Sequence, residues 1–133
     1  MELRAIGSVS SSLRKQEAAP KQGDEGSPEA TVEIDPEFTP ALEGISAGDE
    51  ILLLTWLDRA DRDVLTTHPR NDRSRPEVGV FATRSPDRPN PIGLHRVRVL
   101  SSDGARLRVA DLEALDGTPV LDLKPVLGAV GER

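Results

Sequence analysis

Residues 92–109, IGLHRVRVLSSDGARLRV, alternate apolar and charged side chains over two consecutive stretches. In the first stretch His95, Val97 and Val99 fall on one face, and in the second Leu107 and Val109 repeat the pattern. The positions between them carry Arg96, Arg98, Arg106 and Arg108. Because successive side chains of a strand point to opposite faces, the pattern predicts two strands with one buried and one solvated face.

Short β-rich stretches recur on both sides of this pair. The run EILLLTWL at 50–57 is the most apolar in the chain, and its length and flanking turn signals predict a buried strand. Further strands are expected at 3–9, 31–34, 79–83 and 118–123, the last as the return strand of a hairpin that turns at Asp116-Gly117. Helical turns are expected only at 37–45 and after a cap at Asp58.

About seven short strands with few helices predict a mainly β fold. Two architectures suit this count: a small antiparallel β-barrel with short helical turns, or a sandwich. The chain contains no GxGxxG motif, so a Rossmann nucleotide site is not supported.

The chain of 133 residues fits one domain with one core, expected to span residues 1–133 with a tail at 128–133. Residues 14–30 hold charges, Gly and Pro without an apolar period, which predicts a mobile loop. Without cysteine the chain has no disulfides or cysteine-ligated zinc, and we expect no metal site. No apolar run suits a signal peptide or a membrane span, so a cytoplasmic protein without a membrane partner is expected.

The charge of the chain is unevenly distributed. The formal net charge is −6, which argues against a general DNA-coating protein. Residues 59–98, however, carry nine arginines and five acidic residues. This positive band is either a solvated face or a surface that meets a phosphate backbone.

The segment GVFATRSPDRPNPIG at 79–93 places Pro86, Pro89 and Pro91 within six residues. Each proline fixes its own φ and restrains the residue before it, so the loop has little conformational entropy left to lose. A gain in folding stability of roughly 0.4–1 kcal/mol for each compatible proline would be enough to explain why the loop is stiff. It does not account for the polar side chains in every gap, which a preorganised binding or catalytic loop requires.

Two blocks of sequence, GVFATRSPDRPNPIGL at 79–94 and LDGTPVLDLKP at 115–125, are similar to those of the TsaA-like family, also called the TrmO family. A weaker match is IGSVSSSLRKQEAAPKQG at 6–23, and the resemblance covers residues 3–127. Members of this family are tRNA methyltransferases that use S-adenosylmethionine. The resemblance therefore implies a small β-barrel that forms homodimers, and methyl transfer to N6 of a threonylcarbamoylated adenosine at position 37 of tRNA.

The chain departs from the family pattern at two places. Ser10-Ser11-Ser12 stands where the family often has Ser-Pro-Tyr, and Asp58 stands where it often has His. Both changes bear on contacts with cofactor or substrate and leave the expected fold unchanged.

The resemblance implies a cofactor-binding set, carried over position by position. The set is Lys21, Gln22, Gly23, Asp58, Arg59, Arg88, Ala114, Leu115, Asp116 and Gly117. The planar guanidinium of Arg88 is expected to hold the methionine carboxylate or a ribose hydroxyl. Local roles also suit four of these positions: an ion pair for Arg88, a helix cap for Asp58 and a plain turn for Asp116-Gly117.

Two further groups of polar residues are candidates for the methyl acceptor. The side-chain oxygen of Asn90, fixed between prolines, would accept hydrogen bonds from the adenine amine and act as the catalytic residue. Candidate RNA-binding residues are Arg70, Arg73, Arg75 and Arg84. Neither His68 nor His95 is expected to be catalytic.

Three functions remain open on the sequence. The first is the tRNA methyltransferase with S-adenosylmethionine as cofactor. The second keeps this cofactor and changes the acceptor to a small molecule or another RNA. The third is a barrel that binds S-adenosylmethionine without catalysis.

Overall fold

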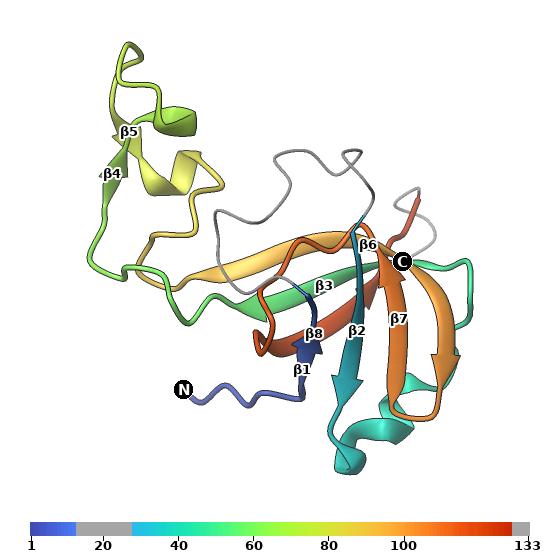
Figure 1. The fold of residues 1–133 in the computed structure, drawn as a ribbon. Helices are drawn as coiled ribbons and strands as arrows, with labels where there is room; N and C mark the ends of the chain where they lie inside the picture. The colour runs from blue at the N-terminus through green and yellow to red at the C-terminus, as the bar shows by residue number, and fades with distance from the viewer. Residues whose placement is uncertain (13–27, 129–133) are drawn as a thin grey trace.

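Six antiparallel strands close into a barrel in the computed structural model, which describes residues 1–12 and 28–128 (Figure 1). The order around the barrel is β1-β2-β7-β6-β3-β8. These strands are β1 (Gly7–Ser10), β2 (Glu29–Ile34), β3 (Glu50–Trp56), β6 (Ile92–Asp103), β7 (Arg106–Ala110) and β8 (Pro119–Pro125). The expectation of a mainly β fold and of a small antiparallel β-barrel is confirmed, and the sandwich is not.

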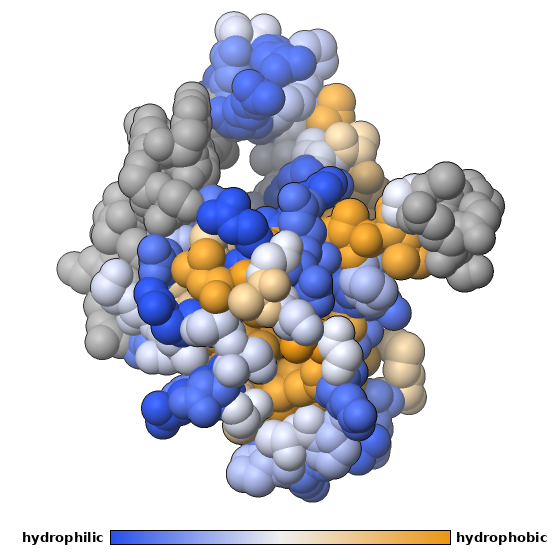
Figure 2. Space-filling model, turned by 90° about the vertical axis from the view of Figure 1, so that its right-hand side faces the viewer, coloured by the Kyte–Doolittle hydropathy of each residue, from blue (hydrophilic) through white to orange (hydrophobic). Residues whose placement is uncertain are grey.

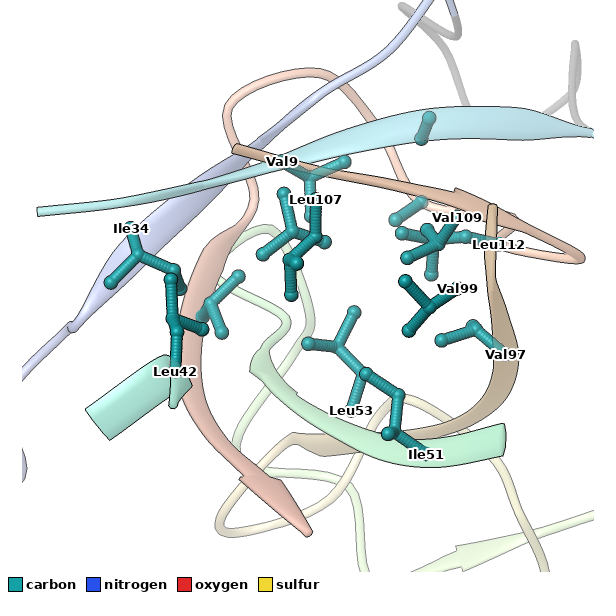
Figure 3. Close-up of a cluster of buried hydrophobic side chains, with 14 residues drawn as sticks. Val9, Ile34, Leu42, Ile51, Leu53, Val97, Val99, Leu107, Val109 and Leu112 are labelled. Atoms are coloured by element: carbon teal, nitrogen blue, oxygen red, sulfur yellow. The ribbon is translucent and has the colours of Figure 1, made fainter. Parts of the chain in front are cut away.

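The barrel interior is filled by one cluster of buried aliphatic side chains (Figure 3). Val97 and Val99 of β6 and Leu107 and Val109 of β7 point into it, as their alternation predicts. Leu53 of β3, in the most apolar run of the chain, joins the same cluster from the strand next to β6. Each such side chain contributes about 1.5–3 kcal/mol through burial, so this cluster is the main source of stability.

Three arginines on the outer barrel face pair with glutamates of neighbouring strands. Arg96 lies 2.5 Å from Glu50, Arg106 lies 3.3 Å from Glu33, and Arg108 contacts Glu29. Exposed pairs of this kind contribute about 0–1 kcal/mol each. These pairs show that Arg96, although within the positive band at 59–98, is neutralised by an acid from outside it.

Residues 65–84 form an arm that projects from the barrel (Figure 1). The arm contains the two-stranded sheet of β4 (Thr66–Thr67) and β5 (Val78–Gly79), and two 3-10 helices, η3 (Pro69–Asn71) and η4 (Val80–Ala82). Figure 2 shows its tip as a hydrophilic cluster at the top of the molecule. The arm thus presents polar side chains to one side of the barrel mouth.

The expected strand at 79–83 and the expected helix after Asp58 are both wrong. Only Val78–Gly79 pairs as a strand, and the chain then turns into η4, where the Thr83 N–H donates to the Val80 carbonyl at 3.0 Å. After Asp58 the chain forms turns, because its N–H groups bind partners outside a helix: the Asp61 N–H donates to Asp87 Oδ1 at 2.9 Å.

The expected hairpin at Asp116-Gly117 is half right. The two residues form a turn, with Gly117 at φ 86°, but β8 pairs with β1 and β3 and β7 pairs with β2 and β6. The helical turn expected at 37–45 is present as the 3-10 helix η2 (Pro36–Leu42). The expected first strand begins at Gly7 instead of residue 3.

Most of the loop expected at 14–30 and most of the tail expected at 128–133 lie outside the described residues. Within the described part, β2 already begins at Glu29, so the end of the expected loop belongs to the barrel. No helix in residues 1–12 and 28–128 is long and apolar enough to cross a membrane.

Candidate functional site

The proline-rich loop at 83–91 is held by the side chain of Arg88. Its Nε donates to the Ser85 carbonyl at 2.8 Å, and its Nη2 donates to the carbonyls of Val80 and Thr83, each at 2.6 Å. Prolines supply no N–H donors, so a loop rich in them has few internal partners for its carbonyls. The guanidinium supplies those partners in one rigid fork. In this structure the predicted cofactor-binding residue Arg88 therefore fixes the loop that surrounds it.

A second arginine, Arg62, ties the loop to the segment that follows β3. Its Nε donates to the Pro89 carbonyl at 2.7 Å, and its Nη2 donates to Asn90 Oδ1 at 3.0 Å. The same guanidinium lies 5.1 Å from the centre of the Trp56 ring, a cation–π contact. Arg62 thus sets the orientation of Asn90, and one lone pair of the amide oxygen remains beyond this hydrogen bond.

Sequence reasoning missed the role of Arg62. In the expected helix after Asp58, helical spacing would have set the direction of the Arg62 side chain. The turns that form instead place its guanidinium over the Trp56 ring. The available signal was the Trp56 ring at the end of a buried strand, followed closely by an arginine.

A cavity of about 240 Å³ lies beside this loop at the mouth of the barrel. Four members of the predicted cofactor-binding set line it: Asp58, Arg59, Ala114 and Leu115. They come from the segment after β3 and the segment between β7 and β8, which are far apart in sequence. Pro86 and Asp87 of the proline-rich loop also line the cavity. The structure thus brings four members of the predicted set, which are distant in sequence, around one cavity.

The turn at Asp116-Gly117 adjoins this cavity and fastens it to β1. Asp116 Oδ1 accepts a hydrogen bond from the Ser11 N–H at 2.9 Å, and the Gly117 N–H donates to the Val9 carbonyl at 2.7 Å. Asp116 and Gly117 therefore hold the backbone of Ala114 and Leu115 in place. Lys21, Gln22 and Gly23, the remaining members of the predicted set, lie outside the described residues.

His95 lines the floor of the cavity and shares a hydrogen bond with a buried hydroxyl. Its Nε2 lies 2.8 Å from Thr55 Oγ1, and Thr55 is fully buried. Burial lowers the pKa of His95 below its ordinary value of 6.5. Asp58, Asp87 and Glu113 line the same cavity. The imidazole is therefore a neutral, hydrogen-bonded group at physiological pH.

The lowered pKa of His95 predicts that folding stability decreases below about pH 6.5. Above that pH the imidazole is neutral in both the folded and the unfolded state. Below it the unfolded chain binds a proton at His95 and the folded protein does not, so the free energy of unfolding falls until the pH reaches the folded-state pKa. One such group contributes at most about 1.4 kcal/mol per pH unit. Urea unfolding between about pH 5.5 and 7.5 measures the slope. His95→Gln should flatten it, and an unchanged slope in this variant would contradict the assignment.

A larger groove of about 960 Å³ lies between the arm and the proline-rich loop. Three of the four predicted RNA-binding residues, Arg70, Arg75 and Arg84, line it, and Arg73 does not. Pro86 and Asp87 line both this groove and the smaller cavity. The two hollows thus meet at the proline-rich loop. No cluster of three metal-ligating side chains occurs within residues 1–12 and 28–128.

Comparison with known proteins identifies the family. The family model described as the tRNA-methyltransferase O N-terminal domain matches residues 8–131. The chain belongs to this family. Both the proline-rich loop and the Asp116-Gly117 turn lie inside the matched range, so the membership covers the whole candidate site.

Curated relatives of this tRNA-methyltransferase O domain are named for a cofactor. A protein of Archaeoglobus fulgidus named probable S-adenosyl-L-methionine-binding protein is 48% identical over 125 residues, covering 94% of this chain and 34% of its own length. One of the same name from Methanothermobacter thermautotrophicus is 43% identical over 125 residues, covering 94% of this chain and 89% of its own.

The solved structures of the family share the fold. The crystal structure of TrmO from Pseudomonas aeruginosa superposes with a TM-score of 0.77 at 33% identity and covers 96% of this chain. This chain spans about a third of the Archaeoglobus protein and 56% of the Pseudomonas one, so each is considerably longer than the domain described above.

Proposed function

We propose that the protein uses S-adenosylmethionine to methylate N6 of threonylcarbamoyladenosine at position 37 of a tRNA. The observation that supports this most is the common wall of Pro86 and Asp87 between the cavity and the arginine-lined groove. A methyl donor in one and an RNA in the other would meet at a rigid loop. Holding two reactants in line is the main contribution a site can make to a displacement reaction.

The side chains of the smaller cavity fit this cofactor. When bound, S-adenosylmethionine supplies a methyl group on a positively charged sulfur. The carboxylates of Asp58, Asp87 and Glu113 offer negative charge toward a cation, and Ala114 and Leu115 offer an apolar surface for the adenine. The volume of about 240 Å³ is below the roughly 300–1,000 Å³ typical of ligand pockets, so we infer that further residues complete it.

Asn90 is the proposed acceptor of a hydrogen bond from the adenine amine. Arg62 already donates to its Oδ1 at 3.0 Å, which fixes the amide and leaves a second lone pair for the substrate. The N6–CH3 bond forms as the S–CH3 bond breaks, and the single hydrogen on N6 then leaves as a proton to water, so no strong base is needed. Orientation of the amine lone pair is then the main contribution of this residue.

Replacing Asn90 with alanine should lower turnover about 100-fold, the scale of one positioned hydrogen bond in a transition state. Cofactor affinity should change little, because Asn90 does not line the cofactor cavity. Single-turnover kinetics and calorimetry measure the two quantities separately. Asn90→Asp keeps an acceptor oxygen and should retain more activity; equal losses of turnover and affinity in Asn90→Ala would rule the role out.

We further propose that the protein acts in the cytoplasm as a homodimer. The outer face of β3 and β6 supports a second copy as partner, because Ile92 and Leu94 are exposed there opposite Trp56 and Leu54. Sedimentation equilibrium should give twice the chain mass, and Leu94→Lys should give the monomer.

Mass spectrometry of tRNA nucleosides tests the function in cells. In cells that lack the protein, the methylated form of threonylcarbamoyladenosine should disappear and the unmethylated form should accumulate. An unchanged methylated peak would dismiss this acceptor, and would favour a small molecule or another RNA. Absence of any heat on titration with S-adenosylmethionine would dismiss the cofactor as well.

A further inference from the structure

Phe81 exposes 82% of its surface, although aromatic residues are rare in this chain. The other phenylalanine, Phe38, packs against the barrel core. Single exposed apolar residues are common, but a phenyl ring on the wall of a polar groove is a costly exposure of apolar area. The position of this ring therefore needs a physical reason.

The backbone beneath Phe81 is rigid, so the ring is held in place. The preceding residue, Val80, is 1% exposed, and its N–H donates to the Leu65 carbonyl at 2.9 Å. The Val80 carbonyl accepts hydrogen bonds from Arg88 Nη2 and from Thr83 Oγ1. Because Val80 points inward, η4 presents Phe81 outward. A ring on a fixed base offers contact area at little further entropy cost.

Three arginines of the groove beside Phe81 have no acidic partner among the described residues, and Asp87, which also lines the groove, accepts a hydrogen bond from the Asp61 N–H. Within residues 1–12 and 28–128, Arg70, Arg75 and Arg84 form no ion pair. The two acids of the arm are turned to neighbours: Asp72 accepts from Ser74, and Glu77 accepts from Thr66. The charges are therefore available to an anionic ligand.

Arg70 also adopts a backbone conformation that is unfavourable for its residue type. Its φ is 54° and its ψ is 29°, in the left-handed region that costs a non-glycine residue roughly 1–2 kcal/mol. Strain of this kind concentrates at ligand-binding positions. Here it lies on the wall of the groove that contains Phe81.

We propose that Phe81 is a stacking platform for an unpaired nucleobase, with Arg70 and Arg75 binding the phosphates of the same RNA strand. Exposed aromatic rings beside a cationic groove are how proteins hold single-stranded nucleic acid. A base in a duplex is already stacked, so the ligand must be a loop or a free strand. The inference rests on the proposed function in one respect: the stacked base is a neighbour of the methylated one, because the groove and the cofactor cavity share Pro86 and Asp87.

Two fluorine signals suffice to test the stacking. The chain has two phenylalanines, so labelling with 4-fluorophenylalanine gives one signal from Phe81 and one from Phe38 as an internal control. Titration with a tRNA anticodon stem–loop should shift the Phe81 signal and leave that of Phe38 unchanged. A fully paired duplex of the same strand should shift neither.

Affinity for the same stem–loop, measured by fluorescence anisotropy, provides the second readout. Phe81→Leu keeps an apolar side chain but removes the π-face, and should weaken binding by about 5- to 150-fold, the scale of one stacked base. Phe81→Trp should retain affinity. Leu65→Ala removes another exposed apolar side chain of the arm, outside the groove lining, and should have no effect.

Three results would overturn the proposal. They are a Phe81 signal that does not shift when the stem–loop is added, a Phe81 signal that shifts as much with the duplex as with the stem–loop, and a Phe81 signal that shifts when the protein alone is diluted. The last would mean that a second copy of the chain covers the ring. Both readouts work without cofactor or turnover, so a failed methyl transfer leaves them valid. Conversely, if the protein transfers the methyl group but Phe81→Leu binds the stem–loop as tightly as the unmodified protein, the proposed function stands and the stacking role of Phe81 is ruled out.

Discussion

The Arg88→Ala variant is expected to lose about 100-fold in methyl-transfer rate, because three hydrogen bonds to Val80, Thr83 and Ser85 disappear together. The loop would no longer hold Asn90 in place, and a displacement of about 1 Å in a site costs on the order of 100-fold. Arg88→Lys should rescue little, since an ammonium cannot reproduce the planar fork.

Hydrogen exchange and calorimetry together reveal how Arg88 acts. If it holds the loop, amide exchange between residues 83 and 92 should accelerate in the Arg88→Ala variant. Arg98→Ala removes an exposed arginine of β6 and should change neither exchange nor rate. Unchanged exchange in Arg88→Ala, combined with weaker binding of S-adenosylmethionine, would instead support direct contact between Arg88 and the cofactor.

Gly7→Ala is expected to destabilise the fold strongly. An added Cβ would lie 2.0 Å from the Glu33 carbonyl oxygen and 3.0 Å from the Cα of Ile34, and both belong to the backbone of β2. Gly7 also pairs with Val120, so β1 closes the barrel at this residue. Because no side chain can move aside, the cost should reach about 3 kcal/mol, the upper end for overpacking.

Urea unfolding of the two glycine variants measures this cost directly. Gly79→Ala is the matched control, since its Cβ would have only the Leu65 carbonyl oxygen within 4 Å, at 4.0 Å, and its φ of −65° suits alanine. Its midpoint should equal that of the unmodified protein. Equal midpoints for Gly7→Ala and Gly79→Ala would contradict the description of how the barrel closes.

The strands of the fold could be predicted because their signal is local. Alternation at Val97, Val99, Leu107 and Val109 is visible in the sequence, and these residues do fill the core. The closure of the barrel could not be predicted in this way, because β1 and β8 are joined only by pairing across the length of the chain. The hairpin expected at Asp116-Gly117 is only half right for the same reason: the turn is local and is present, but the partner of the following strand is distant in sequence.

The candidate site shows the same limit for side chains. The family resemblance grouped Asp58, Arg59, Ala114 and Leu115, and the structure places them around one cavity. The hydrogen bonds of Arg88 had no sequence signal, because an arginine that binds backbone carbonyls does not depend on which residues carry them. For Arg62 the nearby Trp56 signalled a ring contact but not the hydrogen bonds to Pro89 and Asn90.

The most direct test is methyl transfer by the purified protein from S-adenosylmethionine with a deuterated methyl group. The substrate is tRNA that already carries threonylcarbamoyladenosine, and the nucleosides are then analysed by mass spectrometry. We predict that the deuterated methyl group appears on the base of that nucleoside, and that Asn90→Ala reduces the product without abolishing cofactor binding. Cofactor binding without any labelled nucleoside would contradict this prediction.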